Sequence, residues 1–98
     1  MAAKKNGSTE RAVLVTTEHR GVFFGYAEKT SGDTIHLKRA RNCVYWSVDV
    51  KGFLGLAKTG PSTGCRVGPP ADIDLRKITC VAEVTPEAVT AWELAPWK

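Results

Sequence analysis

Closely spaced turn signals divide the chain into short runs of β-branched and aromatic residues, a spacing typical of a β-rich fold. Residues 12–17 (AVLVTT) and 21–27 (GVFFGYA) lie on either side of a short turn, so we expect them to pair as a hairpin. In residues 34–39 (TIHLKR) apolar and polar side chains alternate strictly. This alternation predicts a strand with Ile35 and Leu37 on its inward face.

Further along the chain, three segments have strand character and two have helix character. Strands are expected at residues 44–48 (VYWSV) and 78–84 (ITCVAEV), with a short edge strand at 65–67 between two Gly- and Pro-rich turns. A helix of about two turns is expected between Asp49 and Gly60. Its apolar stripe would consist of Val50, Phe53, Leu54 and Ala57. A threonine N-cap and a proline in the first turn predict a second helix at 86–94.

Together these segments predict one α+β, β-rich domain. Its core would be a small antiparallel sheet or open barrel of about five to six strands, accompanied by two short helices. The 98 residues suffice for a single domain, which we expect at 11–98. Residues 1–10, rich in Lys, Asn, Gly and Ser, are expected to form a flexible arm rather than a secretory signal. No apolar run approaches the ~18 residues of a membrane span, so no membrane partner is expected.

Charge and cysteine content narrow the range of partners. The net charge is +4, and residues 1–60 carry ten Lys/Arg against five Asp/Glu, whereas residues 61–98 carry four against five. This mild basic bias suits an anionic partner but falls short of a dedicated DNA-binding protein. The three cysteines, Cys43, Cys65 and Cys80, include no C-x-x-C spacing, so neither a disulfide framework nor a metal site is expected. We expect Cys80 to pack as a small apolar residue.

Residue patterns for catalysis or for a bound cofactor are absent from the sequence. His19 and His36 are the two histidines, and neither lies in a motif that supplies a nucleophile, a base and an orienting group. No Walker loop, H-E-x-x-H or G-x-G-x-x-G sequence occurs. We therefore expect a protein without enzymatic activity and without a cofactor.

The densest cluster of polar and aromatic residues runs from Lys38 to Ser47 (KRARNCVYWS). Arginine grips phosphate with a planar fork and aromatic rings stack on bases, so Arg39, Arg41, Tyr45 and Ser47 are the first candidates for anion binding. We expect Arg41 to lie in a loop between two strands and to converge with Tyr45 on an accessible concave surface. Trp46 is expected in the core, in phase with Val44 and Val48. Secondary candidates are Arg66, in the short segment between two Gly- and Pro-rich turns, and Arg20, at the tip of the predicted hairpin.

The chain also resembles a family of small accessory proteins of unknown function encoded by tailed bacteriophages and prophages. The resemblance runs from Arg11 to Trp97 and is most specific at Ala40-Arg41 followed by Tyr45-Trp46-Ser47 and the helix G-F-L-G-L-A-K-T-G. Val48 departs from the family, in which a small residue stands at that position. The resemblance implies a phage product that acts in the cytoplasm of the host bacterium, and it implies no established activity.

Four functions follow as hypotheses. The first is a non-enzymatic protein that binds a small anionic ligand and sequesters a nucleotide signal of host immunity, as a homo-oligomer with Arg41 in its interface pocket. On this hypothesis Arg41→Ala abolishes binding and leaves the melting temperature nearly unchanged. The alternatives are an inhibitor of a host protein, a small barrel that binds single-stranded nucleic acid, and a component of the virion.

Overall fold

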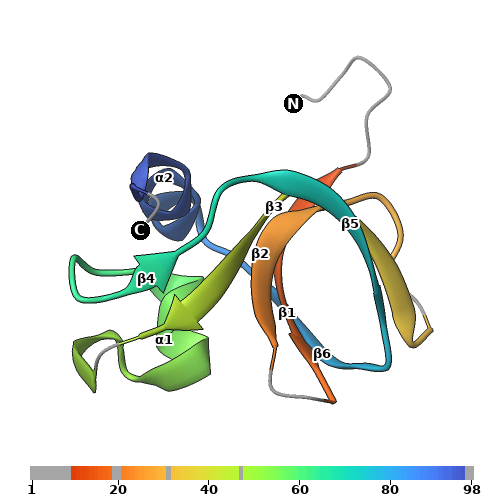
Figure 1. Cartoon of the computed structure of the whole chain (residues 1–98), viewed down its shortest axis with the longest axis horizontal. Coiled ribbons are helices and arrows are strands. Elements are labelled where there is room, and N and C mark those ends of the chain that lie inside the picture. The colour runs from red at the N-terminus through yellow and green to blue at the C-terminus, as the bar shows by residue number, and fades with distance from the viewer. Residues whose placement is uncertain (1–9, 19–20, 31, 47, 97–98) are drawn as a thin grey trace.

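Strands outnumber helices along the chain, as the residue pattern predicts. The computed structural model describes residues 10–18, 21–30, 32–46 and 48–96. Its elements are β1 (Arg11–Thr17), β2 (Val22–Ala27), β3 (Thr34–Tyr45), the 3-10 helix η1 (Val48–Val50), α1 (Gly52–Lys58), β4 (Arg66–Val67), β5 (Ala71–Arg76), β6 (Ile78–Glu83) and α2 (Pro86–Leu94). Within the described residues, six strands and two α-helices form a small β-rich α+β fold (Figure 1). The predicted fold class is therefore confirmed.

The strands form one strongly curved antiparallel sheet, which stays open because its outer strands β5 and β6 do not pair. The order is β4-β3-β2-β1-β6, and β5 pairs with the first part of β3, on the edge that β4 occupies further along. Only Lys77, in a left-handed conformation with φ 57°, separates β5 from β6. The backbone N–H of Glu18 donates to the Lys77 carbonyl at 3.0 Å, which ties this turn to the end of β1. The result is an open barrel (Figure 1).

Strand β1 is buried on both faces, and it divides the apolar core into two clusters. Val13 and Val15 point to one side of the sheet and Leu14 to the other, and all three are 0% exposed. Successive side chains of a strand point to opposite faces, so one strand contributes to both clusters. The hairpin predicted for residues 12–27 is confirmed by the pairing of β1 with β2.

The inner cluster fills the inside of the curled sheet and consists of strand residues alone. Its buried members are Val13, Val15, Ala27, Ile35, Leu37 and Ala40. Half-buried side chains of the outer strands, such as Ile73 and Leu75 of β5 and Val81 of β6, pack against them. The inward position predicted for Ile35 and Leu37 is confirmed.

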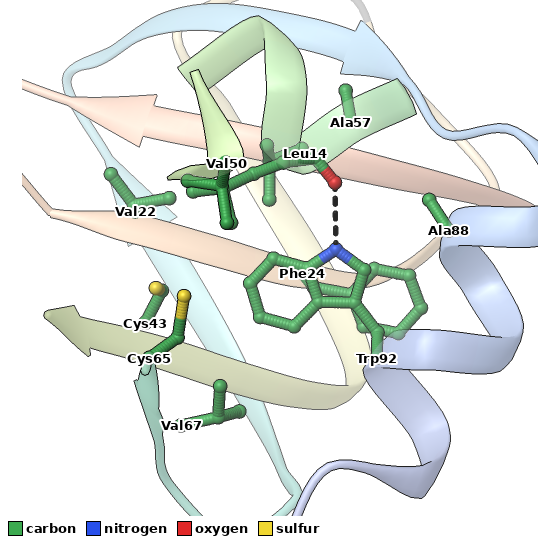
Figure 2. Packing of buried hydrophobic residues seen from close by; sticks show 11 residues of the cluster. Leu14, Val22, Phe24, Cys43, Val50, Ala57, Cys65, Val67, Ala88 and Trp92 are labelled. Atoms are coloured by element: carbon green, nitrogen blue, oxygen red, sulfur yellow. Dashed lines mark hydrogen bonds between the residues drawn. The ribbon is translucent and has the colours of Figure 1, made fainter. Parts of the chain in front are cut away.

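The outer cluster lies between the other face of the sheet and the two helices. Its buried members are Leu14, Val22, Phe24, Cys43, Val50, Leu56, Ala57, Cys65, Val67, Ala88 and Trp92 (Figure 2). The Trp92 ring stacks on Phe24 with 5.2 Å between centroids and 4° between planes. Its Nε1 donates to the Leu56 carbonyl at 3.1 Å. This hydrogen bond satisfies the one polar atom of the ring in a buried site and joins α2 to α1.

The second helix begins and packs as the sequence predicts, whereas the first does so only in part. In α2, the Thr85 hydroxyl accepts from the Ala88 N–H at 3.1 Å, and Pro86 occupies the first turn. Of the stripe predicted for the first helix, Val50 and Ala57 are buried and Phe53 packs against the outer cluster. The prediction is wrong for Leu54, which is 68% exposed, and Leu56 is buried instead. A left-handed turn at Lys51, with φ 65°, separates Val50 from the helix and changes the phase of the residues that follow.

The middle of the chain differs most from the prediction. Segments 34–39 and 44–48, expected as two strands with a loop at Arg41, are replaced by the continuous strand β3 and by η1. Val44 and Val48 are 58% and 95% exposed, so the inward face predicted for them is wrong. Trp46, expected in the core, is half-buried. Strand β5 lies where a turn was expected, although Ile73 and Leu75 alternate there with charged residues.

Strand β6 is present, but its side chains are distributed differently from the prediction. A register shift between Thr16 and Thr17 interrupts its pairing with β1. As a result Ile78 packs against the inner cluster and Ala82 against the outer one, although simple alternation placed them on one face. Cys80, expected to be packed, is exposed. An interruption of this kind depends on the partner strand and leaves no signal in the local sequence.

Candidate functional site

A bulge in β3 positions the cationic side chains of the densest cluster. In β2, Tyr26 pairs with Lys38 and Phe24 pairs with Arg41. Arg39 and Ala40 of β3 therefore both lie opposite Gly25. Arg39 has φ 51°, and Gly25 lies so close to β3 that an added Cβ would be 3.0 Å from the Leu37 Cβ. The glycine therefore makes room for the bulge. The bend expected at Arg41 occurs two residues earlier.

Arg39 lies exposed at the bulge and is held by partners on three sides. Its Nη2 donates to Glu10 Oε1 at 2.9 Å, and its Cζ lies 4.3 Å from the centroid of the Tyr26 ring. Its backbone N–H donates to the Asp72 carboxylate at 2.9 Å. The hydrogen bond to Glu10 raises the pKa of Arg39 and lowers that of Glu10, although partial burial of each opposes the shift. Both groups are therefore charged at neutral pH.

Arg41, by contrast, is only 5% exposed and lies under the end of α2. Its Nε donates to the Gly68 carbonyl at 2.8 Å and its Nη1 to the Trp92 carbonyl at 2.7 Å. The second bond satisfies a carbonyl of the last helical turn, which has no partner within the helix. Nη2 is buried and has no hydrogen-bond partner among the described residues. Burial lowers the pKa of this guanidinium from its usual value.

A cavity of about 460 Å³ adjoins both arginines, and we call it the arginine cavity. Its polar lining comes from Tyr26, Arg39, Arg41 and Glu93. Its apolar lining comes from Phe24, Pro70, Leu94, Ala95 and Pro96. The cavity therefore lies between the curved sheet and the C-terminal end of α2, and it combines two guanidinium groups with apolar walls.

One carboxylate and one phenol in this cavity are bonded to each other. The Tyr26 hydroxyl donates to Glu93 of α2. Burial of the ring, followed by this hydrogen bond to the carboxylate, raises the pKa of Tyr26 above its usual range. The phenol therefore stays protonated at neutral pH and donates to the carboxylate, so the cavity contains two guanidinium groups and one hydrogen-bonded carboxylate.

The structure brings together two of the six predicted site residues. Arg39 and Arg41 both line the arginine cavity. Tyr45 is 54% exposed and is the register partner of Arg66 at the far end of β3, so the predicted convergence of Arg41 with Tyr45 is wrong. The bulged register between Cys43 and Tyr45 turns the tyrosine out of phase with Arg41. The remaining candidates, Ser47 and Arg20, lie outside the described residues, as does His19.

Residues that the sequence did not single out complete the neighbourhood. A second hollow of about 530 Å³, which we call the cationic hollow, shares Tyr26 with the arginine cavity. Its polar lining contains three cationic side chains, two carboxylates, a threonine and a histidine, namely Lys29, Lys38, Arg76, Glu28, Asp74, Thr34 and His36. One of these elements had a signal in the local sequence. Charged and apolar residues alternate in 72–76, a pattern typical of a strand such as β5. The contributions of Tyr26 and Glu93 depend on how α2 packs on β2 and have no local signal.

Charge is balanced across the described part of the chain. Those residues include ten Lys/Arg and ten Asp/Glu, so the net charge of +4 comes from Lys4, Lys5, Arg20 and Lys98, which lie outside it. Among the described residues, no group of three or more His, Cys, Asp or Glu is placed to hold a metal ion. None of the helices there has the length and apolar character that crossing a membrane requires.

Comparison with known proteins gives a family and no function. Neither a curated protein nor a solved structure matches the chain. A family described as a domain of unknown function (DUF6948) matches residues 10–92. That range begins at Glu10, the partner of Arg39, and ends at Trp92, whose carbonyl Arg41 binds. The match covers most of the chain, so this protein belongs to the DUF6948 family.

Proposed function

We propose that this protein is a non-enzymatic binding module whose ligand is a small organic anion held in the arginine cavity. The observation that carries the proposal is the buried Arg41 guanidinium, which lines the cavity and retains an unpartnered Nη2. A buried donor without a partner is costly, by about 1–3 kcal/mol. An acidic oxygen that accepts from Nη2 would remove that cost and would also offset the desolvation of the charge.

The size and the lining of the cavity support the same proposal. Cavities that bind small molecules span about 300–1,000 Å³ and combine apolar walls with a few polar groups. Here Phe24 and Leu94 supply apolar surface, while Arg39 supplies a second, permanently charged donor. Because Glu10 already neutralises Arg39 in part, we propose a ligand with a single acidic group at this position, such as a carboxylate or a phosphate monoester.

The resemblance to phage accessory proteins adds a biological setting to the proposal. We propose that the ligand is a nucleotide signal of the host bacterium and that binding sequesters it in the host cytoplasm. The homo-oligomer expected from the sequence stays a prediction.

A second candidate, binding to a host protein, is favoured by one separate observation. Large apolar side chains are exposed at the end of β3 and in the two helical segments that follow, namely Val44, Tyr45, Val48 and Leu54. Exposed apolar residues of this kind are common at protein interfaces. The net charge of +4 gives less support to nucleic-acid binding, which depends on a larger excess of positive charge.

The experiment for the main proposal is isothermal titration calorimetry with a panel of aromatic carboxylates and aromatic phosphate monoesters. Arg39→Asn removes one charged donor while keeping a residue that tolerates the left-handed backbone. We expect it to weaken binding by about tenfold, because a hydrogen bond to a charged group contributes roughly 1.5–3 kcal/mol. Arg66→Asn is the matched control, since it removes the same charge outside the cavity. Absence of binding by every panel member, or equal effects of both variants, would disprove the proposal.

A further inference from the structure

The cationic hollow differs from the arginine cavity in the residues that line it. No helix residue lines it, and its floor is formed by β2, β3 and β5. Lys29 and Arg76 both line it, and neither has an ion-pair partner among the described residues. Thr34, the register partner of Arg76, lines the same hollow. Two unpaired cations with a nearby hydroxyl are typical of sites that bind a phosphoryl group.

A histidine paired with a carboxylate also lines this hollow. His36 Nδ1 lies 2.7 Å from Asp74 Oδ1 across the β3–β5 pair. The carboxylate oxygen accepts, so Nδ1 is the donor of this pair and Nε2 of a neutral ring can only accept. His36 is therefore not one of the donors that a phosphoryl group would meet. Lys38 is less available, since Glu10 and Glu28 lie 3.5 and 3.6 Å from its Nζ. The free donors therefore lie towards the Arg76 end of the hollow.

The two hollows adjoin each other. Tyr26 lines both, and the consecutive residues Lys38 and Arg39 line one each, because the bulge at Arg39 turns neighbouring side chains in different directions. The Arg39 guanidinium over the Tyr26 ring stands at their boundary. Glu10 pairs with both Lys38 and Arg39 at this boundary. A ligand that contacts both hollows therefore crosses Tyr26 beside this carboxylate.

We infer that the two hollows are the two ends of one site, and that its ligand is a nucleoside monophosphate. The base would occupy the arginine cavity, where Phe24 and Leu94 offer apolar walls and the Arg41 Nη2 offers a donor to a ring or carbonyl acceptor. The phosphoryl group would occupy the cationic hollow, with Lys29, Arg76 and Thr34 as partners. This inference rests on the proposed function only in that the arginine cavity holds part of the ligand. It assigns the acidic group of the ligand to the cationic hollow and an acceptor atom of the base to the arginine cavity, which changes that part of the proposal.

The test follows backbone amide resonances by NMR while the full chain is titrated with three probes. These are inorganic phosphate, a nucleoside and the corresponding nucleoside 5′-monophosphate. The nucleoside and the monophosphate are each tested with the four common bases. We expect the nucleoside to perturb Leu94 and Ala95, phosphate to perturb Lys29 and Arg76, and the monophosphate to perturb both groups. We also expect the monophosphate to bind at least about tenfold more tightly than the nucleoside, as charge-assisted hydrogen bonds imply.

A pair of double variants separates specific contacts from overall charge. Lys29→Gln with Arg76→Gln should weaken binding of the monophosphate by at least about tenfold and leave binding of the nucleoside unchanged. Lys51→Gln with Lys58→Gln removes two charges outside both hollows and should change neither affinity. Retention of the melting temperature in both variants would show that the fold is intact, as expected for exposed side chains.

Three results would overturn the inference. One is a monophosphate that binds no more tightly than the nucleoside, or that perturbs one hollow alone. Another is an equal loss of affinity in both double variants. A third is a single-stranded oligonucleotide that binds far more tightly than any monophosphate, which would favour a nucleic-acid ligand. If aromatic carboxylates bind the arginine cavity while no monophosphate does, the inference fails and the proposed function stands. If no probe perturbs that cavity, both fail.

Discussion

The inner and outer clusters are built on the same strands, yet they differ in composition and in enclosure. The inner cluster contains aliphatic and small side chains from strands alone, and its outer-strand members are only half-buried. The outer cluster contains Trp92, Phe24 and two cysteines, and helices cover it. Its margin also holds polar groups, the indole of Trp92 and the guanidinium of Arg41. Only the outer cluster adjoins the arginine cavity, through Phe24.

The difference indicates that the candidate site lies beside the outer cluster, whose packing also stabilises the fold. A purely aliphatic cluster inside a curled sheet specifies the sheet but offers a ligand no polar atom. The packing of α2 on the sheet brings donors from β3 beneath a helix end, where low polarity strengthens their electrostatic interactions. We therefore expect substitutions in the outer cluster to affect both folding and binding in the arginine cavity. Substitutions in the inner cluster should affect folding alone, except at Ile35 and Leu75, which line the cationic hollow.

The largest contrast is expected in the reactivity of the three thiols. Cys43 and Cys65 are buried in the outer cluster, whereas Cys80 on β6 is exposed. Burial, together with the neighbouring Cys65, raises the pKa of Cys43 to about 12, which suppresses its reactive thiolate. With a thiol reagent at neutral pH, Cys80 should react at once. The buried pair, Cys43 and Cys65, should react at least about a thousandfold more slowly. Equal rates at all three thiols would contradict the enclosure of the outer cluster.

A matched pair of leucines compares the two clusters directly. Leu14 and Leu37 are both 0% exposed, and they belong to the outer and the inner cluster respectively. Replacement of a buried leucine by alanine costs roughly 2–5 kcal/mol, depending on how far the surroundings can close the cavity. The half-buried outer strands beside Leu37 can adjust more easily, so Leu14→Ala should lose about 4–5 kcal/mol and Leu37→Ala about 2–3 kcal/mol. Urea denaturation measures both, and a reversed order would contradict the comparison.

Arg41 tests whether the polar margin of the outer cluster is structural. Arg41→Met keeps much of the apolar stem but leaves the carbonyls of Gly68 and Trp92 without their donor. Loss of a partner for a buried polar group costs about 1–3 kcal/mol, so the unfolding free energy should fall by that amount. This differs from the sequence-based expectation that Arg41 can be replaced without loss of stability. A melting temperature equal to that of Arg66→Met, its exposed control, would show that the expectation from sequence was correct.

The sequence predicted what depends on local pattern. Alternation identified the inward face of Ile35 and Leu37, and the Thr85-Pro86 pair identified the start of α2. In each case the residue types within one element determine the structure. Two of the six candidate site residues, Arg39 and Arg41, lie together at the arginine cavity, because a dense run of cations in one strand keeps its members close even when their surroundings are mispredicted.

What the sequence did not reveal depends on contacts between distant segments. The bulge at Arg39 requires Gly25 on the neighbouring strand, and arginine itself does not favour a left-handed backbone. The burial of Arg41 requires α2, which lies more than forty residues further along the chain. Tyr45 separates from Arg41 through a register shift in its pairing with Arg66. No periodicity within one strand carries that information.

The smallest expected effect concerns Glu10 and Arg39, which lie at the edge of the arginine cavity and outside both clusters. The hydrogen bond from Arg39 lowers the pKa of Glu10 in the folded state. Its stabilisation is therefore fully present above the usual carboxyl pKa and is lost as the pH falls through the lowered value. Because the Arg39 side chain is 54% exposed, screening limits the contribution to at most about 1 kcal/mol.

Glu10→Gln should reduce the unfolding free energy at pH 7 by that small amount and converge with wild type at strongly acidic pH. Urea denaturation at several pH values measures this, with Asp33→Asn as a control that removes an exposed carboxylate elsewhere. A difference between Glu10→Gln and wild type that grew as the pH fell would contradict the ion pair.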